Sequence, residues 1–419
     1  MALSMPRMCN SWSTARCFDN AVAQSIFAQI AGQHRHKAPA RRLLLVVACS
    51  ALAALSHAKD AADLVAVVAG DAQATEIRLV DANSPEAPAR SLGSCIPAAH
   101  PAWSHDGRLL AYEVSRADGA GSQIAWRLWG DRAPEGEGVC GSRFRYHRNP
   151  AVSPDGRYIA CEAYDELPYE SAIVVIDRES GEEAIWGGAR RALFTPEWLP
   201  NPKLLLSLDP NRKVEIPGVD LNAIRAESGL ADGSAITGGP TRALFCVGLD
   251  NREGLLTTEV LLLTESQSLP VLALVPDGPD STRYSEWNPR ISPGGTRFVF
   301  ESDYGGDREI YQLDQNGLLN LTNHHAADWN PAWSENGRWV AFETFRNGMR
   351  QVQRILVETV RVEPLLEEES WSPSWAPNGE ELAAVVLRDG RPRVALVNAG
   401  TRELRLTEPE PAWSPSWRP

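Results

Sequence analysis

One phrase of the sequence recurs at a fixed interval in the C-terminal third of the chain. It places a proline two residues after a tryptophan, and each copy begins 42 residues after the previous one. The copies are Trp287-Asn-Pro-Arg-Ile291, Trp329-Asn-Pro-Ala-Trp333, Trp371-Ser-Pro-Ser-Trp375 and Trp413-Ser-Pro-Ser-Trp417. A period of about 40 residues with one supersecondary unit per repeat is typical of a β-propeller or another stacked array. The fold is therefore predicted from this repeat first.

The residues after each copy predict a β-hairpin. Residues 331–337 end in Asn-Gly and run into Arg338-Trp-Val-Ala-Phe-Glu343, a short stretch of β-branched and aromatic residues. Asn-Gly and Asp-Gly accept the positive φ that tight hairpin turns require. Two further strands follow in each unit, for example Glu309-Ile-Tyr-Gln-Leu313 and Leu318-Leu-Asn-Leu-Thr322. Four short antiparallel strands in each period indicate one propeller blade.

The repeated residues carry a family resemblance. The pattern P-x-W-S-x-D/N-G-x-x-x-A-F/Y, then I-Y-x-x-D-x-x-G, then L-T, resembles the PD40, or WD40-like, repeat of TolB-type propellers of bacterial envelopes. The resemblance covers about Asp63 to the end and is strongest over Asn288 to Pro419, and the Gly-His and Trp-Asp pairs of true WD40 blades are missing. It implies an all-β, single closed propeller; one propeller serves many activities, so it implies no particular reaction.

The two ends of the chain are predicted to share a blade. Pro411-Ala-Trp-Ser-Pro-Ser-Trp417 is a first strand with nothing after it, and three strands near the N-terminus lack a first strand. Those three strands are Leu64–Val68, Glu76–Val80 and Ala89–Leu92. Pairing the chain ends would close the ring and remove the exposed edges of an open array. TolB-type chains are similar in ending this way.

The number of blades follows from the spacing of the units. The units begin near Pro101, Pro150, Pro196, Pro289, Pro331 and Pro373. The interval of 93 residues from Pro196 to Pro289 is about two periods long. With the closing blade, the best count is eight blades, whereas one blade with an insertion in that interval would give seven. The resemblance to TolB itself would imply six.

The N-terminus is predicted to be a targeting segment. Arg41-Arg42 precede an apolar run from Leu43 to Leu55, and Ser56-His-Ala58 provides small residues at a signal peptidase site. Thirteen apolar residues are too few to span a bilayer, so residues 1–58 are interpreted as a cleaved signal peptide with a long n-region and 59–419 as the propeller. A lipoprotein signal at Cys49 is the alternative. The expected location is periplasmic or secreted.

The charge balance argues against two classes of partner. The whole chain carries a net charge of −13, and removing residues 1–58 takes away six basic residues and one acidic residue, which leaves −18. Such a surface repels nucleic acid phosphates and anionic lipid headgroups. The expected partner is an envelope protein, a peptide or a glycan, without a membrane span in the mature chain, and the propeller is expected to be monomeric.

The cysteines suggest one disulfide and no metal site. Four cysteines remain after Ala58, and none has the C-x-x-C spacing of a metal site. Cys95 and Cys140 precede neighbouring blades, so a bridge between them is plausible, with two independent thiols as the alternative. Cys161 lies inside a predicted strand and is expected to belong to the core.

Motifs for catalysis are missing. The sequence contains no G-x-S-x-G elbow and no H-E-x-x-H. His324-His325 with Asp328 is the nearest approach to a ligand cluster, but these residues occupy an ordinary connection between blades. No cofactor is therefore expected.

Two sets of tryptophans have different expected roles. Trp287, Trp329, Trp371 and Trp413 enter the first strand of each blade. Glu301 and Glu343 end second strands, so both sets are expected on one face of the ring, around the mouth of the central channel. These six residues are the predicted binding site, although the four tryptophans could instead wedge neighbouring blades together. A second set, Trp103, Trp333, Trp375 and Trp417, lies within the first strands and is predicted to be blade core.

Three hypotheses for the function remain. The first is a non-catalytic, exported propeller that binds a partner on one ring face in the cell envelope, as a TolB-like protein would. The second is an enzyme of the propeller lyase or lactonase type, with an acid and histidine site or a metal at the channel mouth. The third is a structural subunit of an envelope complex. A convergent set of histidines and carboxylates on the axis would favour the enzyme, and an aromatic rim would favour binding.

Overall fold

The structure is a computed structural model of the chain. It describes residues 63–71, 74–93, 97–129, 134–187, 192–199, 243–252, 255–271, 284–314, 316–408 and 410–419. The predicted signal peptide, the lipoprotein alternative at Cys49, and Cys95 all lie outside these residues. Within the described ranges, no helix has the length and apolar character needed to cross a membrane.

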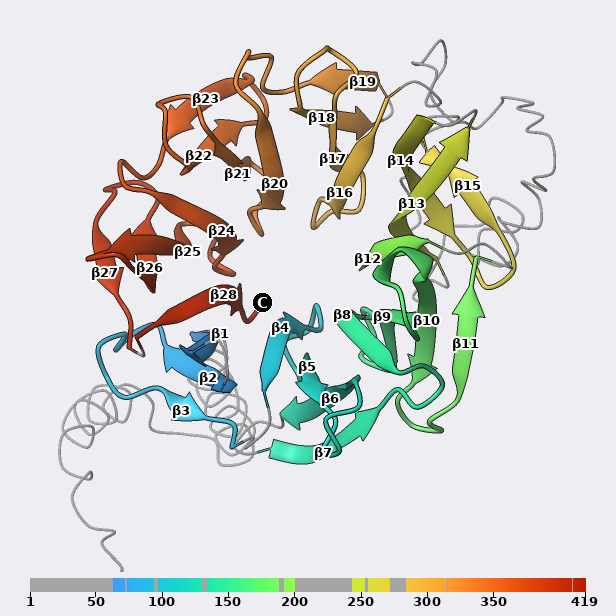
Figure 1. Cartoon of the computed structure of the whole chain (residues 1–419). Coiled ribbons are helices and arrows are strands. Elements are labelled where there is room, and N and C mark those ends of the chain that lie inside the picture. The colour runs from blue at the N-terminus through green and yellow to red at the C-terminus, as the bar shows by residue number, and fades with distance from the viewer. Residues whose placement is uncertain are drawn as a thin grey trace, which may run out of the picture. The chain divides into compact units, whose positions relative to one another are not determined.

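The described residues form seven antiparallel sheets of four strands, and Figure 1 shows them as blades around a central opening. Blade A contains β28 (Ala412–Trp417), β1 (Leu64–Asp71), β2 (Ala74–Asp81) and β3 (Arg90–Ser91). Blade B contains β4 (Ala98–Trp103), β5 (Leu109–Ser115), β6 (Ser122–Trp129) and β7 (Pro134–Cys140). Blade C contains β8 (Tyr146–Val152), β9 (Tyr158–Tyr164), β10 (Ala172–Asp177) and β11 (Glu183–Trp186), with a 3-10 helix at Pro168–Glu170.

The other four blades continue around the ring in chain order (Figure 1). Blade D contains β12 (Leu193–Trp198), β13 (Leu244–Arg252), β14 (Leu255–Leu263) and β15 (Ser268–Pro270). Blade E contains β16 (Glu286–Ile291), β17 (Phe298–Ser302), β18 (Glu309–Asp314) and β19 (Gly317–Asn320). Blade F contains β20 (Asp328–Trp333), β21 (Trp339–Thr344), β22 (Gln351–Leu356) and β23 (Arg361–Pro364). Blade G contains β24 (Ser370–Trp375), β25 (Glu381–Arg388), β26 (Arg391–Asn398) and β27 (Leu404–Leu406).

The predicted closure is confirmed. β28 pairs with β1 in an antiparallel register that sets Trp417 opposite Val65 and Trp413 opposite Val68. The residue that follows β28 extends the contact: the Arg418 amide donates to the Leu64 carbonyl at 2.9 Å. The Arg418 guanidinium Nε donates to the Gly107 carbonyl of blade B at 2.6 Å. The last residues therefore bind the first strand of the chain and the next blade at once.

The best prediction of eight blades is wrong, and the ring has seven. The error lies in the interval from Pro196 to Pro289, which holds one blade whose first and second strands are far apart in the sequence. β12 pairs directly with β13, although residues 199–243 separate them. The Leu199 amide donates to the Ala243 carbonyl at 3.2 Å, so both ends of this connection lie at one hairpin position. The extra residues therefore separate two strands that belong to the same blade.

The core lies between neighbouring blades. Along β1, Val65 and Val67 pack with blade G, whereas Ala66 and Val68 pack with blade B. This alternation arises because successive side chains of a strand point to opposite faces of its sheet. Each blade is therefore apolar on both faces, and a contact such as Phe245 against Phe298, with ring centroids 4.5 Å apart, joins blade D to blade E. Trp103, Trp333, Trp375 and Trp417 are buried, which confirms their predicted place in the core.

Deleting residues 412–419 should strongly destabilise the ring. The deletion removes β28, exposes the edge of β1, and leaves the apolar surface that buried Trp417 uncovered, where one truncated tryptophan alone costs about 3–5 kcal/mol. We expect a large drop in the midpoint of thermal unfolding measured by circular dichroism. Glu358→Ala, at an exposed turn, is the control and should leave the midpoint nearly unchanged. An unchanged midpoint after the deletion would contradict the closure.

Candidate functional site

The first strand of every blade has the same local distortion. Its third residue, or the fourth in blade C, has a left-handed backbone, with φ between 44° and 53°, and proline follows it. The seven residues are His100, Asn149, Thr195, Asn288, Asn330, Ser372 and Ser414. Asparagine tolerates this conformation better than most side chains. The register between first and second strands shifts at this point in every blade, so each inner strand bulges where it faces the channel.

A buried glutamate fixes this bulge in several blades. Glu343 of β21 is fully buried, and its Oε1 accepts a hydrogen bond from Asn330 Nδ2 of the same blade at 2.6 Å. The same oxygen accepts the Ser372 backbone amide of the next blade at 2.9 Å. Arg350 Nε donates to the other oxygen at 2.5 Å and balances the buried charge. One carboxylate therefore joins two neighbouring blades, and we call this arrangement the glutamate bridge.

The glutamate bridge recurs in blades C and E. Glu301 accepts Asn288 Nδ2 and the Asn330 amide, both at 2.6 Å, and Glu162 accepts Asn149 Nδ2 and the Thr195 amide, both at 2.8 Å. Burial raises the pKa of Glu301, and Arg308 opposes this shift. In blades D, G and A a valine stands at the corresponding position of the second strand. These valines are Val247, Val385 and Val68.

The second set of tryptophans surrounds a central cavity of about 600 Å³. The indole N–H of Trp103, Trp333 and Trp375 donates to a backbone carbonyl of the preceding blade's inner strand, at 3.1, 3.3 and 3.1 Å. Trp198 makes the same bond to the Ala151 carbonyl at 2.9 Å. These bonds tie the inner strands together and leave a cavity within the size range of ligand pockets. Its other lining residues include the bulge residues His100, Asn149, Thr195, Asn330, Ser372 and Ser414.

A few ionisable groups line the cavity. Arg290 Nη1 lies 3.6 Å from Glu197 Oε2, and enclosure in the channel raises the pKa of Glu197 although water still reaches the group. Burial also raises the pKa of Glu335, and His105, which lines the same cavity, opposes that shift. His100 Nδ1 lies 2.9 Å from Glu113 Oε2, and the other imidazole nitrogen, Nε2, takes no part in this contact. The cavity therefore offers both acidic and basic groups to a polar ligand.

The first set of tryptophans lies beside these bridges and is half buried. Trp287 and Trp329 stand directly opposite Glu301 and Glu343 in the strand register. The lining of the central cavity comes from the second set of tryptophans and does not extend to Trp287, Trp329, Trp371 and Trp413 among the described residues.

Arginines pack on these tryptophans. The Arg308 guanidinium lies 4.3 Å from the ring centroid of Trp287. Arg350 lies between two rings, 5.9 Å from that of Trp329 and 5.4 Å from that of Trp371. Glu301 binds Arg308, and Glu343 binds Arg350. The two predicted glutamates therefore act on this surface by fixing the arginines.

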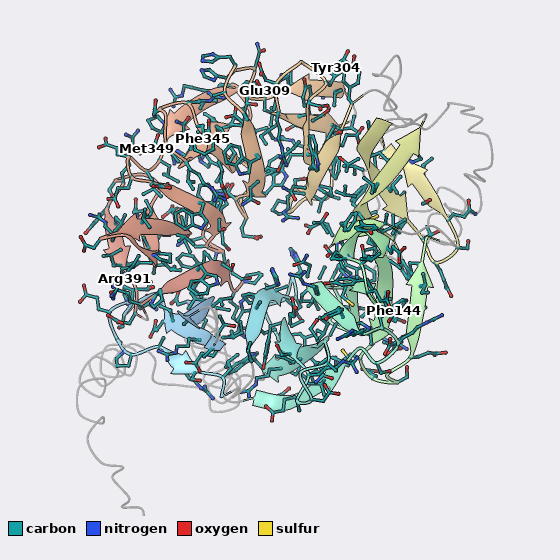
Figure 2. The ribbon with its side chains drawn as sticks, viewed as in Figure 1. Phe144, Tyr304, Glu309, Phe345, Met349 and Arg391 are labelled. Carbon is teal, nitrogen blue, oxygen red and sulfur yellow. The ribbon has the colours of Figure 1, made fainter. Side chains whose placement is uncertain are left out.

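Large exposed apolar side chains gather on the same face. We call it the loop face, the face at which second strands end and third strands begin. Of the exposed large apolar residues in the described part of the chain, five lie in these connections: Leu167, Tyr169, Tyr304, Phe345 and Met349. Phe345 is 51% exposed and packs on Trp329, with ring centroids 5.2 Å apart. Figure 2 shows Tyr304, Phe345 and Met349 on the outer part of blades E and F.

The cysteine and histidine residues singled out from the sequence lie in the following environments. Cys140 lies in β7, and burial raises the pKa of its thiol to about 12; its suggested partner Cys95 is outside the described residues. His324 and His325 stack with centroids 4.1 Å apart. Asp328 is buried and is bound by Arg346 at 2.5 Å, so its charge is already compensated. The described residues contain no group of three ligand side chains placed to hold a metal ion.

The fold and these sites define a closed, seven-bladed propeller with a central cavity and an aromatic loop face. Residues 280–419, which span blades E, F and G and strand β28, match the family described as the TolB beta propeller domain, PD40. This part of the chain therefore consists of TolB-type propeller repeats, as the resemblance implied. A search of curated proteins found no match.

Solved structures share the fold at low sequence identity. TolB from Acinetobacter baumannii is 17% identical with a TM-score of 0.48, over 86% of this chain and 67% of that chain. The β-propeller domain of the Trilobed protease from Pyrococcus furiosus, described as having an open velcro topology, is 12% identical with a TM-score of 0.56, over 83% of this chain and 95% of that one. A prolyl endopeptidase structure is 15% identical with a TM-score of 0.50, over 75% of this chain and 42% of that one. TolB and peptidase propellers are thus both among the structures that it resembles.

Glu343→Ala should destabilise the protein by about 3 kcal/mol or more. The change removes the buried acceptor of Asn330 and Ser372, and each buried donor left without a partner costs about 1–3 kcal/mol, whereas the partly exposed Arg350 is hydrated. The measurement is urea unfolding followed by tryptophan fluorescence. The control is Glu358→Ala at an exposed turn, which should change stability by less than about 0.5 kcal/mol. Equal stability of the two variants would show that the bridge contributes little.

A further buried carboxylate stands at the start of β16. Glu286 joins blade E to blade D, because its Oε2 accepts the Val260 amide at 2.7 Å. Its Oε1 has no hydrogen-bond partner within the described part of the chain. Burial raises its pKa to about 8, and the charges of Glu259 and Asp303 add to the shift. The neutral form is therefore the stable form of this side chain in the folded protein.

Glu286→Gln should stabilise the protein at alkaline pH. The folded pKa is raised above the unfolded value, so the native state binds the extra proton, and the contribution of Glu286 to the free energy of unfolding falls as pH rises from about 4.5 to about 8. Glutamine resembles the protonated acid and lacks this loss. Thermal midpoints of wild type and variant should be similar at pH 4.5, with the variant higher at pH 8.5. A difference independent of pH would contradict the shifted pKa.

Proposed function

We propose that this chain is a non-catalytic binding protein of the bacterial cell envelope that holds a partner protein, peptide or glycan on its loop face. The observation that carries the proposal is the gathering of exposed apolar side chains in the connections between second and third strands. Exposed apolar side chains that share one surface, as Phe345 and Met349 do in the loop between β21 and β22, commonly mark an interaction site. The TolB-type repeats and the expected signal peptide support the envelope location.

The surroundings of Phe345 suit a binding surface. Phe345 packs on Trp329, and Arg350 fills the space between Trp329 and Trp371. Because Glu343 holds Arg350, these rings form a surface that loses little freedom when a partner binds. Tryptophan and arginine are also the residues that most often dominate the binding energy of interfaces.

Trp329→Ala and Phe345→Ser should separate binding from stability. Phe345 is 51% exposed and packs on Trp329, so its replacement should cost about 0.5–1.5 kcal/mol of stability while it weakens partner capture. If Trp329 only wedges blades together, its truncation should cost about 3 kcal/mol and leave capture by the folded fraction intact. Thermal unfolding and partner capture are measured on the same samples, with Trp371→Ala as a further test.

A photocrosslinking residue at position 345 tests the proposed surface directly. The mature protein is expressed with the crosslinker at Phe345 or, as a control, at Val139, which is 59% exposed on the outer strand of blade B. We expect a discrete adduct in envelope extracts from position 345 and none from position 139. Adducts at neither position, or equally at both, would contradict a binding site on the loop face. Mass spectrometry of the same protein tests the expected first residue, Lys59.

One observation favours an enzyme as the second candidate. His100 lies in the central cavity with Nδ1 held by Glu113, an arrangement that orients the other imidazole nitrogen as a general base. An activity of the lyase or lactonase type at this position would use His100 as the proton acceptor. Turnover of lactones or uronate polymers by the wild type, lost in His100→Ala and retained in Phe345→Ser, would favour this candidate over the binding protein.

A further inference from the structure

We propose that the partner reaches the loop face through a segment that combines apolar side chains with lysine or arginine. This inference rests on the proposed function and names the chemistry of the partner. It concerns the Phe345 patch, defined as Phe345, Met349 and the exposed part of Trp329. Phe345 and Met349 are 51% and 42% exposed in the loop between β21 and β22, which gives an incoming apolar side chain two contacts.

Exposed acids border this patch. Glu367 and Glu369 precede β24 and are exposed. The side chain amide of Gln351 donates to the Glu367 carbonyl at 2.7 Å, and the Ser370 amide donates to the Arg350 carbonyl at 2.9 Å. These hydrogen bonds hold the acidic segment beside the loop that carries Met349. One short peptide can therefore contact both the acids and the patch.

The arginines around the patch are already engaged. Arg346 binds Asp328, and Arg350 binds Glu343, each at 2.5 Å. Arg388 is bonded to Glu368, the residue between the two exposed acids. In the described part of the chain, Glu367 and Glu369 themselves form no ion pair, so their charge remains for a partner. The border of the patch is thus negative, on a chain whose net charge is −13.

The same combination occurs in a second connection of the loop face. The segment between β9 and β10 exposes Leu167 and Tyr169, and the acids Glu166 and Glu170 flank them. No ion pair engages these two acids within the described residues. Two loops from different blades, with unrelated sequences, therefore expose apolar side chains next to carboxylates that form no ion pair within the described residues.

This pattern selects among partners. A basic and apolar segment gains both hydrophobic contact and charge attraction, which steers association and fixes the register of the complex. An acidic segment with the same apolar residues would meet repulsion. A neutral glycan would use the aromatic rings and would not respond to the acids. The response to charge therefore identifies the partner class.

The test uses three fluorescent peptides and the mature protein. The first combines phenylalanine and leucine with lysine, the second replaces lysine with glutamate, and the third keeps lysine but replaces the apolar residues with serine. Fluorescence anisotropy measures binding at about 50 mM and about 300 mM salt, where screening differs. We expect only the first peptide to bind, and its binding to weaken at the higher salt concentration.

Variants locate the binding. Glu367→Gln with Glu369→Gln should weaken binding of the first peptide at least tenfold, and Phe345→Ser should do the same. The matched control is Glu380→Gln with Glu403→Gln, which removes two exposed charges from turns at the opposite ends of strands, and it should leave binding unchanged.

Three results would overturn this inference. They are failure of the first peptide to bind, equal binding of the glutamate peptide, and equal effects of the acidic double variant and its control. If any of these occurs while crosslinking at position 345 still yields a partner, the binding function stands and only the basic character of the partner is wrong. If crosslinking fails as well, the proposed function itself is wrong.

Discussion

The antiparallel pairing of β28 with β1 is the contact on which the ring depends. The other blades are built from strands that are consecutive in the sequence, whereas blade A joins residues from the two ends of the described chain. Long-range pairing of this kind is formed only after the intervening chain has been ordered. Arg418 donates a hydrogen bond to Gly107 of blade B, and Trp417 packs against apolar residues of blade G. The central cavity and the loop face keep their geometry only while this contact persists.

The inner strands show how one local conformation serves the whole assembly. A left-handed residue before proline bulges the strand toward the channel, and in blades C, E and F a buried carboxylate accepts hydrogen bonds from two blades at that point. The same carboxylates in blades E and F orient Arg308 and Arg350, which pack on the tryptophans of the loop face. The interior bonding of the ring and the composition of its surface are thus physically linked. A change to Glu343 would alter both.

Much of this architecture could be predicted from local sequence. The repeated tryptophan and proline phrase and the Asp-Gly or Asn-Gly turns predicted the four-stranded blades. The unpaired strand at Pro411–Trp417 predicted the closure. Each of these patterns arises from the local geometry of a strand or a turn. The blade count could not be predicted, since the spacing of the units does not reveal that the strands on either side of residues 199–243 pair with each other. The role of Glu301 and Glu343 was missed for another reason. From sequence alone, a glutamate at the end of an apolar strand is predicted to be exposed. Its burial becomes predictable only when an asparagine of the preceding strand, such as Asn330, is recognised as its hydrogen-bond partner.

The loop face was only partly predictable. The register that sets Trp329 opposite Glu343 follows from the hairpin, so their shared face could be inferred. The exposure of Phe345 and Met349 could not, because aromatic and sulfur-containing side chains after a strand are usually buried. Only the folded loop shows that neither residue has a neighbouring blade to cover it fully.

The distribution of glutamate and valine on the second strands gives two kinds of junction at six blades, whereas in blade B Glu113 contacts His100 and Arg148. Where Glu162, Glu301 and Glu343 stand, one carboxylate accepts hydrogen bonds from the inner strands of two neighbouring blades. Where Val68, Val247 and Val385 stand, the joint at that position is apolar and insensitive to protons. Two of these valines belong to the closing blade and to the blade before it. The ring is therefore completed at blades A and G with apolar contact at this position, and its carboxylate joints follow blades C, E and F.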